Sequence, residues 1–162
     1  MRKYPELDFV CGPDQIHLLP DLVNRALRGK QSVAANLLTD KDDYQFVDSV
    51  PSSEITSSTA FVKVIKGCNY RCSYCIVPSV RGNEISRDPD SVVEEISKLM
   101  KLGAREVTLL GQNVTAYSLE DKRRALPDLI KKITDETSIE RIRIMAPHPS
   151  DVSNELIDEY AT

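Results

Sequence analysis

The chain has 162 residues, enough for one ordinary domain, and its 41% apolar and 28% charged content is typical of a globular protein. No run of about 18 apolar residues is present, which argues against a membrane-spanning helix. The first residues lack the apolar core of a signal peptide, so we expect a cytoplasmic protein. The net charge of −4 argues mildly against a general nucleic-acid binder, because such proteins are usually basic.

Residues 1–29 contain one predicted strand and one predicted helix. The strand covers residues 7–11 and ends at a Gly-Pro pair, and the helix follows from Asp14 until Gly29, with Pro20 restarting it at a first-turn position. One strand and one helix cannot bury a core of their own. We therefore expect this stretch to be the end of a larger domain.

Residues 30–57 are polar and are predicted to form a linker, with a short extended piece at residues 44–47. Four aspartates of this stretch are interpreted as solvated surface charge: Asp40, Asp42, Asp43 and Asp48.

From Ala60 onward, strand-like and helix-like patterns alternate. The predicted strands are residues 60–65, 106–110 and 139–145, and the predicted helices cover residues 88–102, 126–133 and the stretch after Ser153. This alternation predicts an α/β fold with a parallel sheet and right-handed crossovers.

Three of the four cysteines, Cys68, Cys72 and Cys75, lie close together with the spacing Cys-x3-Cys-x2-Cys. Thiolates are ligands for iron–sulfur clusters and for zinc, so both kinds of site fit this loop. The spacing favours the cluster, because a structural zinc site usually presents two Cys-x2-Cys pairs or adds two histidines. Inert thiols are a third alternative. Cys11 lies far upstream and is interpreted as a small buried apolar residue.

The three-cysteine spacing, with aromatic Tyr74 just before the last cysteine, resembles the motif of the radical S-adenosylmethionine (SAM) enzymes. The residues that follow are similar to the methylthiotransferases, and the Gly-Gln-Asn-Val stretch resembles their tRNA-modifying branch, the MiaB type. The stretches that carry this second resemblance are Ile76-Val77-Pro78, Arg81-Gly82, Glu84, Ser86-Arg87 and Leu109-Leu110-Gly111-Gln112-Asn113-Val114.

The resemblance implies a fragment of a larger enzyme. Residues 1–29 would be the carboxyl-terminal remnant of the N-terminal methylthiotransferase domain, residues 30–57 a linker, and residues 58–162 the N-terminal half of a radical SAM domain. That half corresponds to a partial parallel (βα) barrel, with about three of six βα units. A second [4Fe–4S] cluster is expected only in the full-length protein. We therefore predict that this chain alone does not complete sulfur insertion.

The resemblance also implies a mechanism. Cys68, Cys72 and Cys75 would hold a [4Fe–4S] cluster whose open iron chelates SAM, and an electron from a donor such as flavodoxin or ferredoxin would cleave the cofactor. The full-length enzyme would insert a methylthio group at C2 of an N6-isopentenyl-type adenosine next to the tRNA anticodon. Two alternatives stay open: a methylthiotransferase acting on a ribosomal protein, for which a Gln-Asp pair is expected instead of Gln112-Asn113, and a zinc-binding interaction module.

Three marked stretches follow predicted strands, so we expect them to line one face of the sheet: the cysteine loop, Gly111-Gln112-Asn113 and Ala146-Pro147-His148-Pro149. The cofactor-binding candidates are Tyr74, Ser86, Arg87, Gly111, Gln112 and Asn113. No role is assigned to Arg81, Glu84 and His148, and the residues before His148 depart from the hydroxyl residues usual in the family. The pair Arg123-Arg124 is interpreted as surface charge rather than as an RNA contact.

Overall fold

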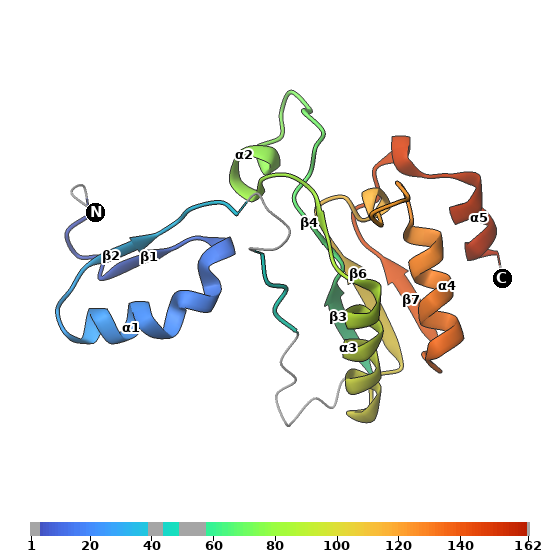
Figure 1. The fold of residues 1–162 in the computed structure, drawn as a ribbon, viewed down its shortest axis with the longest axis horizontal. Coiled ribbons are helices and arrows are strands. Elements are labelled where there is room, and N and C mark those ends of the chain that lie inside the picture. The colour runs from blue at the N-terminus through green and yellow to red at the C-terminus, as the bar shows by residue number, and fades with distance from the viewer. Residues whose placement is uncertain (1–3, 39–43, 49–57, 162) are drawn as a thin grey trace.

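The computed structural model describes residues 4–38, 44–48 and 58–161. Figure 1 shows two parts of the molecule. Residues 4–38, at the left of the view, form what we call the N-terminal lobe, and residues 58–161, at the right, form the C-terminal lobe. Within the described ranges, no helix has the length and apolarity that a membrane span requires.

The N-terminal lobe contains two short parallel strands and a helical segment between them. β1 (Phe9–Cys11) pairs with β2 (Ser32–Ala34), and they are joined by the 3-10 helix η1 (Pro13–Leu18) and the helix α1 (Leu19–Leu27). The predicted strand and helix are thus confirmed. β2 corrects the predicted linker, which was expected to begin at residue 30. Three residues are too few to show a period, and β2 becomes a strand only through its pairing with β1.

The segment 44–48 contains no helix or strand, so the extended piece expected at residues 44–47 forms no strand pairing among the residues that the structure describes. Three of the predicted linker aspartates, Asp40, Asp42 and Asp43, lie outside the described residues.

The centre of the C-terminal lobe is a parallel sheet of β3 (Thr59–Lys63), β6 (Glu106–Leu110) and β7 (Arg141–Ile144). Its order is β3-β6-β7, with β6 hydrogen-bonded on both sides. The predicted parallel α/β arrangement is confirmed. The apolar core lies between this sheet and its helices and includes the fully buried residues Val62, Ile96, Val107, Leu109 and Ile133.

Three helices form a layer against this sheet: α3 (Pro89–Lys101), α4 (Leu126–Glu136) and α5 (Asn154–Tyr160). α4 packs between α3 and α5. Side chains cap two of the helices: the Asp88 carboxylate accepts from the Ser91 backbone N–H at 3.0 Å, and the Ser153 hydroxyl accepts from the Leu156 N–H at 3.2 Å.

A short antiparallel hairpin interrupts the β/α alternation between β3 and α3. β4 (Ile65–Lys66) pairs with β5 (Ile85–Ser86), and between them lie the cysteine loop and the five-residue helix α2 (Val77–Arg81). We call residues 65–86 the cysteine hairpin. The chain turns at Gly67 with φ +78°, where a β-carbon would overlap the Asn83 carbonyl. Neither β5 nor α2 was predicted, because two to five residues give no periodic signal.

Candidate functional site

The cysteine hairpin meets the loops that follow β6 and β7. The Gly67 backbone N–H donates to the Gln112 side-chain oxygen at 2.6 Å. The Tyr70 hydroxyl donates to Asp151 at 2.9 Å, and its ring stacks on the His148 ring. The prediction that the three marked stretches lie on one face of the sheet is therefore confirmed.

Each of the three clustered cysteines is a free, half-buried thiol. Burial raises the pKa of the Cys68 thiol, and the negative charges of Glu84, Cys75 and Cys72 raise this pKa further. A hydrogen bond from the Cys75 N–H to the Cys72 carbonyl, at 3.0 Å, closes a turn between these two ligand candidates. Three thiols in one loop are the right donor type for an iron–sulfur cluster.

The thiols are not arranged around a ready-made ion site. Among the residues that the structure describes, no three His, Cys, Asp or Glu side chains form a group that would hold a metal ion. The assignment of these three cysteines as cluster ligands stays a prediction.

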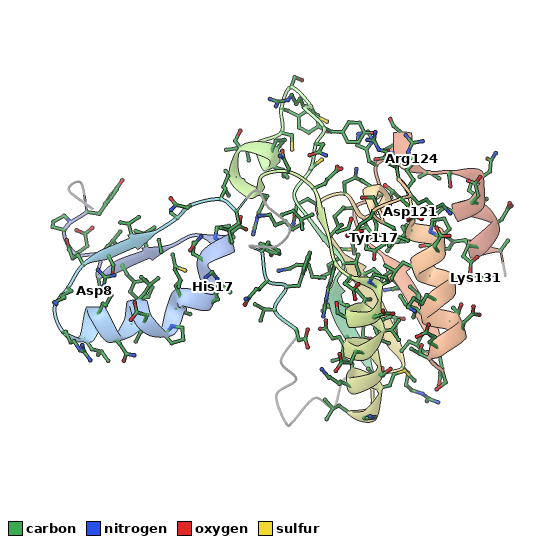
Figure 2. The ribbon with its side chains drawn as sticks, viewed as in Figure 1. Asp8, His17, Tyr117, Asp121, Arg124 and Lys131 are labelled. Carbon is green, nitrogen blue, oxygen red and sulfur yellow. The ribbon has the colours of Figure 1, made fainter. Side chains whose placement is uncertain are left out.

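Cys11 lies apart from the other three cysteines. It ends β1 in the N-terminal lobe, in which Figure 2 also places Asp8 and His17. Its thiol is half-buried and donates to the Gln15 carbonyl at 3.4 Å. This environment agrees with the interpretation of Cys11 as a structural residue.

Five residues from the three strand-end loops form a closed ring of contacts, which we call the Asp151 network: Tyr70, Asn113, Thr115, His148 and Asp151. Asp151 accepts from the Tyr70 hydroxyl at 2.9 Å and from the Asn113 amide at 2.8 Å. The Thr115 hydroxyl donates to the Asn113 oxygen at 2.8 Å and accepts from the His148 N–H at 2.9 Å. The His148 ring stacks on Tyr70 at a centroid distance of 3.9 Å, which closes the ring.

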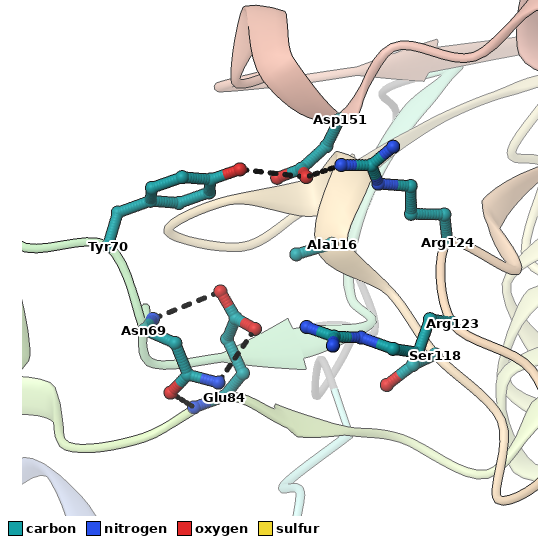
Figure 3. A pocket seen from close by; sticks show the side chains of 8 residues that line it. All are labelled: Asn69, Tyr70, Glu84, Ala116, Ser118, Arg123, Arg124 and Asp151. Carbon is teal, nitrogen blue, oxygen red and sulfur yellow. Dashed lines mark hydrogen bonds and ion pairs between the residues drawn. The ribbon is translucent and has the colours of Figure 1, made fainter.

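An open pocket of about 760 Å³ lies beside the Asp151 network and the cysteine loop (Figure 3). Its lining is mainly polar and charged: Asn69, Tyr70, Glu84, Ala116, Ser118, Arg123, Arg124 and Asp151. Glu84 accepts from both the backbone N–H and the side-chain amide of Asn69, each at 3.0 Å, which fixes the lower wall in this view.

The two arginines at the pocket differ. Arg124 is 52% exposed, which agrees with its interpretation as surface charge, and it also forms an ion pair with Asp151 at 3.2 Å. The guanidinium of Arg123 points into the pocket in Figure 3 and makes no hydrogen bond or ion pair with a described residue.

The predicted cofactor-binding residues of the loop after β6 contact other residues of this protein. Asn113 is 1% exposed, and both ends of its amide are used within the Asp151 network. The Gln112 oxygen holds the turn at Gly67. Gly111 allows a close approach of Ile65, whose side chain a β-carbon at this position would overlap.

Ser86 and Arg87 also have partners inside the protein. The Ser86 hydroxyl accepts from the Ser118 N–H at 2.9 Å. Arg87 is 5% exposed and forms ion pairs with Glu95 and with Asp48. Arg87 is thus not among the residues that line the pocket, and Asp48 is not merely a solvated surface charge.

Tyr74 has the opposite environment. It is 90% exposed. Its role in cofactor binding stays a prediction.

Sequence reasoning missed Tyr70, Thr115, Arg124 and Asp151 as site residues. Tyr70 lies between two of the clustered cysteines, in a stretch that the sequence had marked, whereas Asp151 lies just beyond the marked stretch that ends at Pro149. Their mutual contact spans 81 residues of chain and carries no local signal.

Comparison with known proteins places this geometry in a family. Residues 62–162 match the radical SAM superfamily. The chain is similar to proteins named tRNA-2-methylthio-N(6)-dimethylallyladenosine synthase: 45% identical to that of Syntrophotalea carbinolica, 43% to that of Citrifermentans bemidjiense and 39% to that of Myxococcus xanthus, each over 99% of this chain. It spans only 34–37% of the length of these relatives.

Among solved structures, the fold resembles the radical SAM methyltransferase TsrM from Kitasatospora setae. The structure with tryptophan and a SAM analogue matches with a TM-score of 0.63, and the structure with cobalamin and a [4Fe–4S] cluster matches with a TM-score of 0.62, both at 18% identity. Each match covers 94% of this chain and 34–35% of the TsrM chain. At this identity the likeness concerns the fold, and it agrees with the predicted partial βα barrel. The match of residues 62–162 shows that the chain belongs to the radical SAM superfamily.

Proposed function

We propose that this chain is the SAM-cleaving part of a tRNA methylthiotransferase. The whole enzyme would insert a methylthio group at C2 of an N6-isopentenyl-type adenosine next to the anticodon. The observation that carries the proposal is the position of the cysteine loop, beside a polar pocket at the carboxyl ends of three parallel strands. The names of the relatives support the methylthio reaction and the tRNA substrate.

We also infer the division of the chain. Residues 58–162 would be the N-terminal half of the radical SAM domain, with three parallel strands in place. The N-terminal unit would extend beyond residue 29 to include β2, because β2 pairs with β1.

Cys68, Cys72 and Cys75 would hold a [4Fe–4S] cluster with one open iron. When bound, this cluster supplies the electron that cleaves the carbon–sulfur bond of SAM. The residues of this chain position the loop: Gln112 fixes its first turn, and Glu84 holds the backbone at Asn69. The exposed ring of Tyr74 offers a face for the adenine of SAM.

The outer surface of the hairpin suits an electron-donating protein such as flavodoxin or ferredoxin. Ile76, which directly follows the last cysteine, is 67% exposed, and Val80 in α2 is 42% exposed. Apolar side chains of this kind would let a carrier approach the cluster closely.

A substrate RNA would have to be bound by local positive charge, because the net charge of the chain is −4. Arg123 is the pocket residue that suits a phosphate, since Arg124 is already paired with Asp151. Arg123→Gln should lower the salt dependence of RNA binding by about one phosphate contact. Arg105→Gln, on an exposed arginine that does not line the pocket, is the control.

Anaerobic reconstitution of the 162-residue chain with iron and sulfide tests the proposal. We expect about four irons per chain and visible charge-transfer absorption, with reductive cleavage of SAM to methionine and 5′-deoxyadenosine. Cys72→Ala should abolish all three. Cys11→Ala is the matched control and should retain them, because Cys11 lies in the other lobe.

Zinc bound without iron, and no cleavage of SAM, would contradict the proposal and favour the zinc-binding module. If this chain cleaved SAM but the whole enzyme methylthiolated a ribosomal protein instead of tRNA, only the proposed substrate would be wrong.

A further inference from the structure

We propose that Asp151 is a positioning residue that holds the cysteine loop over the pocket through Tyr70. The use of that loop for a cluster rests on the proposed function, whereas the positioning itself is a property of this chain.

Tyr70 is the side chain that ties the loop to the far side of the site. The loop itself, residues 68–76, forms another side-chain hydrogen bond at Asn69, but its partner Glu84 belongs to the same hairpin. A further hydrogen bond, from the Tyr70 backbone to the Cys68 thiol, also stays within the loop. The hydrogen bond from Tyr70 to Asp151 and the stacking of the Tyr70 ring on His148 therefore link the tip of the loop to the β7 end of the sheet.

Asp151 is built to hold this contact. It is 7% exposed, and one carboxylate oxygen accepts from Tyr70 and faces Arg124, while the other accepts from Asn113. Each donor points at a full negative charge, which makes these hydrogen bonds stronger than neutral ones. The positive charge of Arg124 offsets the cost of burying the carboxylate.

The backbone around the Asp151 network is held in an uncommon conformation. Arg124 and Ala146 both have positive φ, 56° and 54°, which is disfavoured for residues other than glycine. Arg124 forms the ion pair with Asp151, and Ala146 precedes the stacked His148 by two residues. Both residues with positive φ therefore lie next to the Asp151 network.

Thiol alkylation of the apo chain tests the role of Asp151 without any cluster. The rate of labelling is followed for each cysteine by mass spectrometry, with Cys11 in the N-terminal lobe as an internal reference. Tyr70→Phe and Asp151→Asn should each raise labelling of Cys72 and Cys75 relative to Cys11 by about threefold to tenfold, because the loop loses a charge-assisted hydrogen bond.

Asparagine keeps the shape of Asp151, but its NH₂ group replaces one of the two oxygens that accept hydrogen bonds. One of the donors, Tyr70 or Asn113, then faces another donor. The matched controls are Tyr160→Phe and Asp158→Asn on α5, away from the Asp151 network. Both should label like the wild type. The double variant Tyr70→Phe/Asp151→Asn should label no faster than the faster single variant, since the two residues act through one contact.

Unchanged labelling of the loop cysteines in both single variants would overturn the proposal. So would a parallel rise at Cys11, which indicates general unfolding, or independent, multiplying effects in the double variant. In the reconstituted protein, Tyr70→Phe should also lose iron to a chelator several times faster than Tyr160→Phe. A failure of reconstitution would contradict the proposed function but would leave the alkylation result as the measure of positioning.

Discussion

The base and the tip of the cysteine hairpin are held in different ways. At the base, Lys66 in β4 and Arg87 just after β5 are both buried and both form ion pairs. At the tip, residues 68–76 are exposed or half-buried and are held by Tyr70 and by the contact between Asn69 and Glu84. The hairpin therefore has an anchored base and a loosely held tip, and the thiols belong to the tip.

The two anchors at the base join different parts of the molecule. Lys66 donates to Asp14 of the N-terminal lobe at 2.5 Å and to the Leu38 carbonyl at 2.8 Å, and its ammonium lies 4.3 Å from the centre of the Tyr44 ring. Arg87 instead binds Glu95 of α3 and Asp48. Lys66 thus ties the two lobes together directly beside the cysteine loop, whereas Arg87 fixes the hairpin to its own lobe.

The largest effect is expected from breaking the anchor between the lobes. Lys66→Met leaves the Asp14 carboxylate buried without a cation, which should cost about 3–5 kcal/mol of the free energy of unfolding. The double variant Lys66→Met/Asp14→Leu should recover more than half of this loss, because no buried charge is left unpaired. Urea denaturation measures both. If the double variant lost as much free energy of unfolding as Lys66→Met and Asp14→Leu together, packing and not charge pairing would join the lobes.

Breaking the second anchor should cost less. Glu95→Ala removes a buried partner of Arg87, but Asp48 still faces the guanidinium, so we expect a loss of about 2–3 kcal/mol by urea denaturation. Glu94→Ala, on the exposed side of the same helix, is the control and should change stability by less than about 0.5 kcal/mol. Equal losses in the two variants would contradict an anchoring role for Arg87.

The smallest effect on stability is expected at the tip. Glu84→Gln keeps one acceptor for Asn69 and removes the charge, and the pair is near solvent, so the loss should stay below about 1 kcal/mol. Thiol alkylation of Cys68 should nevertheless increase, since its neighbourhood loosens. A loss as large as that of Glu95→Ala would show that base and tip are anchored alike.

Much of the fold could be predicted because its signals are local. The β/α alternation from Ala60, the caps at Asp88 and Ser153 and the three-cysteine spacing all lie within short stretches of chain. Short elements escaped prediction for the same reason: β2, β5 and α2 have no period of their own and exist through pairing and packing.

The sequence by itself determined which loops carry chemistry, because parallel strands bring their carboxyl ends to one edge. Only the tertiary structure decided what each polar residue in these loops does. Asn113 and Arg87 carry the side chains expected of ligand-binding residues, yet their amide and guanidinium groups are buried and bonded to the protein. Asp151 gave no signal along the chain and became the centre of the site, because its three partners come from segments that meet only on folding.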